Sequence, residues 1–229
     1  MKKIMITSLI TVFMSGAAFA DVSAQSGFFV GGNIGWSNPT TWNDSSVAQA
    51  YLANSATSSV NGLSGGVSVG YNFAVNPSVL VGAELGYMYL GSTSYDLQGG
   101  FTGGTNLSSS EDAFQFLFTT TYVMPNGFNV FAKAGAAEVT QTNFNNVNIP
   151  GFGSQPFFSG GTSAVLPAAA IGMGYMPNNH LNITLQYEQF FGNNNSNVQN
   201  YVVPGLTNSP NPQSVGVLSL GLSYSFGQS

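Results

Sequence analysis

Residues 79–89 read Val-Leu-Val-Gly-Ala-Glu-Leu-Gly-Tyr-Met-Tyr, and this stretch decides the fold. Its odd positions carry Val, Ala, Leu and Tyr, whereas its even positions carry Leu, Gly, Glu and Met. Successive side chains of a β-strand point to opposite faces, so a period of two predicts a strand with one continuous apolar face. Repeated glycines and the lack of a 3.6-residue period argue against a helix.

The same alternation recurs in segments 28–36, 63–73, 114–124, 128–137, 165–175, 181–190 and 216–226. Together with 79–89 they make about eight predicted strands, each close to the nine to eleven residues that a tilted strand needs to cross a bilayer. The opposite face of these strands is mostly Gly, Ser, Thr, Ala and Asn. The pattern therefore predicts an all-β, antiparallel transmembrane barrel.

The predicted connections alternate in length. Short links at 74–78, 125–127 and 177–180 contain Pro and Asn, which favour tight turns. The long links are rich in Asn, Ser, Thr and Gly, and they fall around 38–62, 91–112, 138–163 and 192–214. Short periplasmic turns facing long extracellular loops are typical of a membrane barrel with an even number of strands. We expect the long links to be loops.

The low charge content limits the classes of function that the protein can have. Only 5% of the 229 residues are charged, against roughly 25% in an average soluble domain. Lys2 and Lys3, a short apolar stretch and Ala18-Phe19-Ala20 predict a signal peptide over 1–20, which leaves 21–229 as the barrel domain. The remaining chain has one cation, Lys133, and a single Lys cannot form a surface that binds nucleic acid.

Two barrels share this strand pattern. A soluble lipocalin-like carrier buries its apolar face around a ligand, whereas a membrane barrel turns it toward lipid. The aromatic residues of the apolar face favour the membrane barrel, because they gather at both ends of the strands as two interfacial girdles. The first girdle, near the short turns, contains Tyr71, Phe73, Tyr122, Phe128, Tyr175, Tyr224 and Phe226, and the second contains Trp36, Tyr87, Tyr89, Phe114 and Tyr187.

Four stretches carry a family resemblance: Phe28-Phe29-Val30-Gly31-Gly32-Asn33-Ile34-Gly35, Val81-Gly82-Ala83-Glu84-Leu85-Gly86-Tyr87, Asn129-Val130-Phe131-Ala132-Lys133-Ala134-Gly135 and Leu220-Gly221-Leu222-Ser223-Tyr224-Ser225-Phe226. On these the chain resembles the small outer-membrane β-barrels, namely the OmpA-type transmembrane domain and the opacity-protein-like barrels. The resemblance implies the outer membrane of a Gram-negative bacterium, with outer-membrane lipid, lipopolysaccharide and the outer-membrane assembly machinery as partners. Such barrels usually end on an aromatic residue, whereas Gly227-Gln228-Ser229 follow Phe226 here.

The inner face carries a luminal charge cluster of Glu84, Lys133 and Glu188. An eight-stranded barrel is narrow enough for such side chains to meet across the lumen. A buried Lys needs a partner, so we expect Lys133 to pair with Glu84, Glu188 or both. The cluster is either a structural plug or a constriction that selects ions.

The sequence gives little support for catalysis or for a cofactor. The only His, His180, falls in a short turn, and Cys is absent, so we expect no catalytic residue, no metal site and no enzyme activity. Asp44, Asp96 and the Glu111-Asp112 pair fall in long links, where we expect solvated carboxylates.

The predicted function is therefore a structural or surface-interaction role, adhesin-like or in envelope integrity. The long loops would present it to surface molecules of a host or a neighbouring cell. Phe152, Phe157 and Phe158 are unusual for an exposed loop and are candidates for a contact there. The alternative is a small pore for ions or small solutes, with the luminal Glu and Lys residues as its constriction.

Overall fold

The computed structural model describes residues 22–39, 55–98, 105–149, 153–192, 212 and 214–227. The signal peptide predicted over 1–20, Asp44 and Phe152 lie outside these residues. Within the described ranges there is no helix that is both long and apolar enough to cross a membrane.

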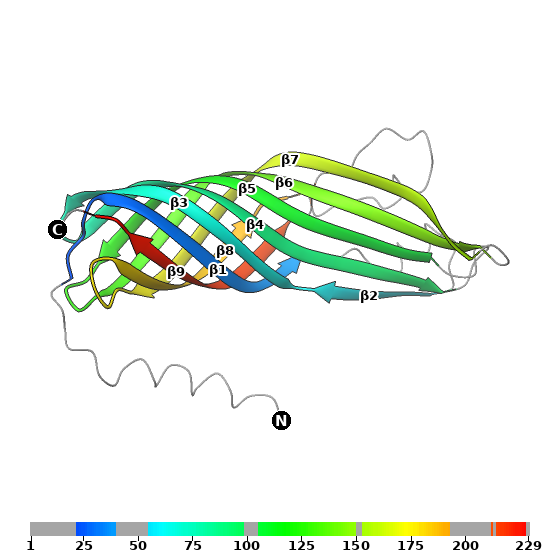
Figure 1. Cartoon of the computed structure of the whole chain (residues 1–229), viewed down its shortest axis with the longest axis horizontal. Helices are drawn as coiled ribbons and strands as arrows, with labels where there is room; N and C mark the ends of the chain where they lie inside the picture. The colour runs from blue at the N-terminus through cyan, green and yellow to red at the C-terminus, as the bar shows by residue number, and fades with distance from the viewer. Residues whose placement is uncertain are drawn as a thin grey trace, which may run out of the picture.

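The described residues form one antiparallel sheet of nine strands. The strands are β1 (Gly27–Pro39), β2 (Ser55–Asn61), β3 (Leu63–Asn76), β4 (Val79–Gln98), β5 (Thr105–Val123), β6 (Phe128–Ile149), β7 (Gly153–Tyr175), β8 (Leu181–Phe190) and β9 (Val215–Ser225). The order is β2-β4-β3-β1-β9-β8-β7-β6-β5, and β5 pairs again with β4. This second pairing closes a barrel of eight strands, with β2 outside the ring (Figure 1).

The two faces of each strand differ as the alternation predicts. On β4, Leu85 and Tyr87 of the outer face are about half exposed, whereas Glu84 and Met88 of the inner face are buried. The same holds on β5, where Phe116 is exposed and Leu117 is fully buried. The predicted antiparallel barrel with an apolar outer surface is thus confirmed.

The three short turns also lie where the sequence predicts them, and each is fixed by an Asn side chain. Asn76 Oδ1 accepts a hydrogen bond from the Ser78 N–H group at 2.9 Å. Asn126 and Asn178 accept from the N–H groups two residues further on, at 3.2 and 2.9 Å. Asn side chains bond in this way to their own backbone in tight turns.

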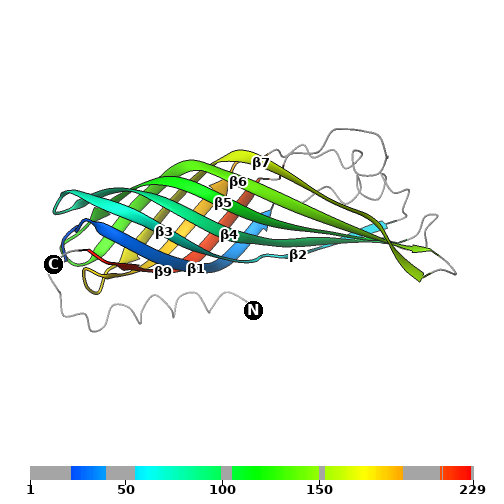
Figure 2. The same ribbon diagram turned by 45° about the horizontal axis from the view of Figure 1, so that its top comes forward.

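The expectation of loops in the long links is wrong for much of their length. Residues 91–98 and 105–112 continue β4 and β5, and 138–149 and 153–163 continue β6 and β7. β2 lies within the first long link and pairs with Ser92–Gln98 of β4. We call β2 and the parts of β4 to β7 that extend beyond the closed ring the distal sheet. Figures 1 and 2 show β4 to β7 running on past the ends of β1, β8 and β9.

A β-bulge lies where β4 leaves the closed ring for the distal sheet. The pairing of β4 with β5 shifts between Tyr89 and Gly91, which leaves Leu90 as an extra residue. Gly91 has a φ of 100°, a conformation that residues with a Cβ rarely adopt. Such a bulge bends a strand and increases its twist, which suits a strand that changes from a barrel wall to an open sheet. Phe157 and Phe158, expected in a loop, fall within β7.

Candidate functional site

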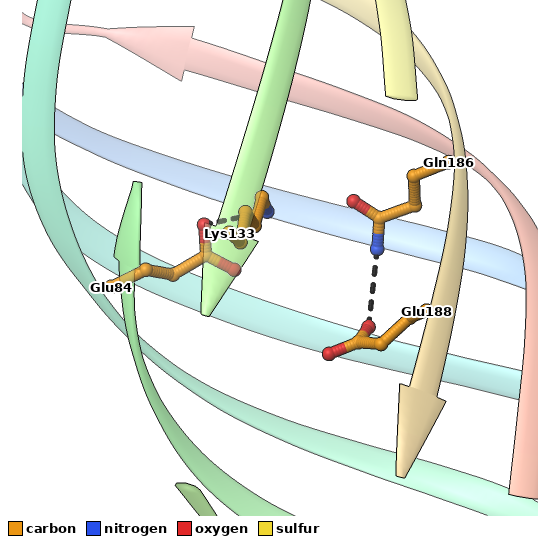
Figure 3. A network of polar contacts seen from close by, with 4 residues as sticks. All are labelled: Glu84, Lys133, Gln186 and Glu188. Atoms are coloured by element: carbon orange, nitrogen blue, oxygen red, sulfur yellow. Dashed lines mark hydrogen bonds and ion pairs between the residues drawn. The ribbon is translucent and has the colours of Figure 1, made fainter. Parts of the chain in front are cut away.

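An ion pair lies inside the barrel. Lys133 Nζ on β6 lies 2.8 Å from Glu84 Oε2 on β4, with β5 between the two strands (Figure 3). Both side chains occupy inner-face positions, since Glu84 pairs in register with the buried Leu117, and Lys133 with the buried Thr119. The Lys133 ammonium also lies 5.5 Å from the centre of the Phe131 ring.

Glu188 belongs to the same inner face but has a different partner. Its Oε2 accepts a hydrogen bond from Gln186 Nε2 at 3.3 Å (Figure 3). Glu188 Oε1 is buried and has no hydrogen-bond partner among the described residues. In the strand register Ala170 lies between Lys133 and Glu188. The structure thus brings Lys133 together with Glu84, while Glu188 bonds to an amide.

Two apolar layers lie on either side of these charges. The larger layer, toward the distal sheet, includes Met88, Leu90, Ala113, Leu117, Ala137, Val139, Leu166, Ala168, Phe190, Val215 and Val217, all buried. The smaller layer, at the short-turn end, consists of Val22, Ala24, Leu80, Val123 and Met176. Side chains from six strands meet in the larger layer, so they fill the lumen as expected for a barrel of this size.

A cavity of about 100 Å³ lies between the charges and the short-turn end. Its lining includes both members of the ion pair, together with Asn33, Asn72 and Gln186. Asn33 Oδ1 is buried without a hydrogen-bond partner among the described residues. A polar space of this size is large enough to hold water.

The twelve predicted girdle residues all lie on the outer surface, where eleven are exposed and Tyr175 is half-buried. Neighbouring rings touch at the short-turn end. Phe128 and Tyr175 have ring centres 5.2 Å apart, and Tyr224 and Phe226 have theirs 5.0 Å apart.

The acidic residues expected in loops are placed differently. Glu111 lies in β5 and is 8% exposed, so the expectation of a solvated loop carboxylate is wrong for it. Asp112 is the next residue of β5, and Asp96 lies in β4. The reason is that these strands are longer than a bilayer crossing requires. In the described parts of the chain, no group of three or more His, Asp or Glu side chains is arranged to hold a metal ion.

His180 lies in the predicted short turn, but it is not simply solvated. Its Nδ1 lies 2.9 Å from the Ser225 carbonyl oxygen, and its ring stacks on Tyr224 with centres 5.7 Å apart. His180 therefore helps to fix the end of β9 against the turn between β7 and β8. The sequence alone could not reveal this contact, because it joins residues that are 45 positions apart.

Sequence reasoning missed two other contributors to the lumen. Gln186 falls on the inner face of 181–190 by its period of two, but the period does not show that it is the hydrogen-bond partner of Glu188. Val22 and Ala24 precede the first predicted strand, but they are buried at the short-turn end. Their apolar-polar alternation, Val-Ser-Ala-Gln, was the available signal.

A closed ring of strands, apolar outside and filled with polar and apolar side chains inside, defines a transmembrane β-barrel. The family model described as the OmpA-like transmembrane domain matches residues 23–229, so the chain belongs to this family. It is accordingly a protein of the bacterial outer membrane. No curated protein matches the chain.

Solved structures of small outer-membrane barrels are similar at low identity. Ail, the attachment invasion locus protein of Yersinia pestis, is 12% identical, with 88% of this chain and 98% of that chain covered and a TM-score of 0.47. The outer membrane protein OprG from Pseudomonas aeruginosa is 11% identical, with 90% and 98% covered and a TM-score of 0.47. At this identity the likeness concerns the fold alone.

Proposed function

We propose that this barrel is a non-conducting scaffold that holds the distal sheet outside the outer membrane for a structural or surface-interaction role, adhesin-like or in envelope integrity. The observation that carries the proposal is the continuity of β4 to β7 from the barrel into the distal sheet. β6 and β7 stay paired from Phe128↔Tyr175, beside the short turns, to Ile149↔Gly153. A rigid scaffold of this kind presents the connecting segments at its far end for recognition.

The filled lumen favours the function of a scaffold rather than that of a pore. A conducting path needs a continuous column of water, and apolar constrictions exclude water from a narrow pore. Here Leu117, Val139 and Phe190 of the larger apolar layer have no exposed surface. The alternative function, a small pore with a Glu and Lys constriction, rests on the ion pair between Lys133 and Glu84, which lies inside the lumen.

The two aromatic girdles are the proposed contacts of the barrel with the lipid head groups. Amphipathic aromatic rings favour the level of the lipid head groups. We propose that the short-turn girdle contacts the inner leaflet and that Trp36, Tyr87, Tyr89, Phe114 and Tyr187 contact lipopolysaccharide in the outer leaflet. Phe226 and its neighbours on β9 are the proposed contact with the assembly machinery.

The partner of the distal sheet is proposed to be uncharged. Lys2 and Lys3 precede the described residues, and the third cation of the sequence, Lys133, is held inside the barrel. A sulfated or phosphorylated polymer binds chiefly through clustered Lys and Arg side chains. The described distal positions instead include Ser92, Thr93 and Ser94 paired with Ser110, Ser109 and Ser108. Hydroxyl groups of this kind suit hydrogen bonding to a neutral surface molecule.

The test is removal of distal hairpins from a bacterium that displays the protein. One variant joins Ser92 to Ser110 through a short turn, and a second joins Thr142 to Gly161, since each pair faces the other in register. Both leave the closed ring intact. Folding is checked on a gel by the difference in migration between unheated, folded barrel and heated, unfolded chain. Loss of cell-surface binding with a folded barrel supports the proposal, whereas unchanged binding in both variants contradicts it.

A further inference from the structure

Five residues ahead of β1, Val22–Ser26, cross the short-turn end of the barrel. The N–H groups of this segment donate to one acceptor in each short turn: Ala24 to the Pro77 carbonyl at 2.8 Å, Val22 to the Pro125 carbonyl at 3.5 Å, and Ser23 to Asn179 Oδ1 at 3.4 Å. The segment therefore spans the end of the lumen rather than running along one strand. We call it the strap.

The strap also packs against residues that line the cavity. Val22 and Ala24 are 4% and 8% exposed, and they pack with Leu80, Val123 and Met176. Leu80 and Met176 are at the same time lining residues of the cavity that contains the ion pair. The strap thus covers the apolar side chains that separate the polar cavity from the periplasmic side.

We propose that the strap is a lid over the luminal cavity: when it is displaced, water and small solutes reach Lys133 and Glu84 from the periplasmic side. The larger apolar layer still separates the cavity from the distal sheet, so an open strap makes a pocket and not a channel. The proposal concerns the opposite end of the molecule from the distal sheet and does not rest on its role in surface interaction.

The strap is built to move more easily than the barrel. Its residues have no place in the strand ladder, and two of its three bonds to the turns are 3.4 Å or longer. Its hinge is firm, because Ser26 Oγ accepts a hydrogen bond from the Ala74 N–H group at 2.8 Å and β1 begins one residue later. A segment outside the strand ladder can open locally at lower free energy than the ladder itself.

The cavity behind the strap is suited to solvent. The ion pair and the amide side chains of Asn72 and Gln186 line it, and Asn33 Oδ1 lacks a hydrogen-bond partner among the described residues. Buried polar groups without partners favour the entry of water. Displacing the strap would therefore uncover Leu80 and Met176 and, behind them, the polar lining of the cavity.

Because the sequence contains no Cys, a single introduced thiol reports access directly. Thr121→Cys places the thiol on the cavity lining, and Asn126→Cys places a matched control in the exposed turn between β5 and β6. Each is combined with the intact strap, with deletion of residues 22–25, and with Val22→Asp/Ala24→Asp. The refolded proteins are reconstituted in lipid nanodiscs, where both barrel ends face buffer, and the rate of reaction with a hydrophilic maleimide is measured.

We expect Thr121→Cys to react at least tenfold faster in both strap variants, with the rate of Asn126→Cys unchanged. Two results would overturn the proposal: equally fast reaction of Thr121→Cys beneath the intact strap, or equally slow reaction after the strap is altered. If the deletion fails to fold, the double substitution keeps the chain length and decides the question by itself.

Discussion

Lys133 Nζ lies 2.8 Å from Glu84 Oε2, so one ion pair inside the lumen joins β6 to β4 over the intervening β5. The two side chains are only 15% and 6% exposed. Removing two charges from water costs free energy, which their attraction and hydrogen bonding offset only in part. The pair therefore affects the stability of the barrel most when one member is removed and the other stays buried without a partner.

Lys133→Met should destabilise the barrel strongly, because the Glu84 carboxylate would stay buried without its cation. Breaking a buried pair in this way costs about 3–5 kcal/mol. The double variant Lys133→Met/Glu84→Gln should recover most of this loss, since it leaves no charge unpaired. Urea unfolding in lipid vesicles, followed by Trp fluorescence, measures both. A single variant as stable as the parent would contradict the importance of the pair.

Glu188→Gln should behave differently from Glu84→Gln. Glu188 is 1% exposed and bonds to the Gln186 amide rather than to Lys133. An amide of the same shape keeps a hydrogen-bonding group there without a buried charge, so we expect the free energy of unfolding to stay within about 1 kcal/mol or to rise. Glu84→Gln leaves Lys133 unpaired and should be destabilising in the same urea assay. Equal losses in the two variants would mean that Lys133 is shared by both carboxylates.

Gly135→Ala should impair closure of the barrel. A Cβ at this position would fall on the Phe116 carbonyl oxygen and lie 3.0 Å from Leu117 Cα, both in the backbone of β5. Gly32→Ala is the matched control, because the nearest atom to its Cβ is the Gly66 carbonyl oxygen at 3.6 Å. We expect a lower yield of folded barrel for Gly135→Ala and a normal yield for Gly32→Ala. Similar yields would show that β5 can shift to make room.

The refolded protein should not bind immobilised heparin at physiological ionic strength. The reason is the lack of surface cations, since Lys133 is engaged inside the barrel and the other two Lys residues lie in the predicted signal peptide. Surface plasmon resonance at low and physiological salt tests this directly, with a neutral glycan as the control surface. Saturable binding that weakens as salt is added would contradict the proposal of an uncharged partner.

The period of two was enough to predict the barrel and both of its faces. Within 79–89, for example, it placed Glu84 inside and Tyr87 outside, as the structure does. A side chain can point only to one face or the other of a strand, so a correct register fixes every orientation at once. The short turns were equally clear, because Asn and Pro mark them chemically.

The distal sheet could not be predicted in the same way. Ser108–Ser109–Ser110 and their neighbours show no apolar alternation, which is the signal that predicts the strands of the closed ring. Their strand structure comes from pairing with β4 and β6, which is a tertiary effect that overrides local propensity. The same limit explains Glu111, whose burial depends on strands that the loop expectation did not include.

The choice of partner for Lys133 was also beyond the sequence. Glu84 and Glu188 are both inner-face carboxylates, and periodicity does not give the distance across a lumen. In the register one strand separates Lys133 from each carboxylate, β5 from Glu84 and β7 from Glu188. The choice therefore depends on the side-chain conformations, which bring Glu84 Oε2 to Lys133 Nζ.

The most direct test of the filled barrel is its conductance after refolding into a planar lipid bilayer, measured for the parent and for Lys133→Met. With folding confirmed by circular dichroism, we expect a silent bilayer for both, because Leu117, Val139 and Phe190 still fill the lumen beyond the charges. Discrete single-channel openings of the parent, altered when Lys133 is neutralised, would contradict the filled barrel and establish the ion pair as the constriction of a pore.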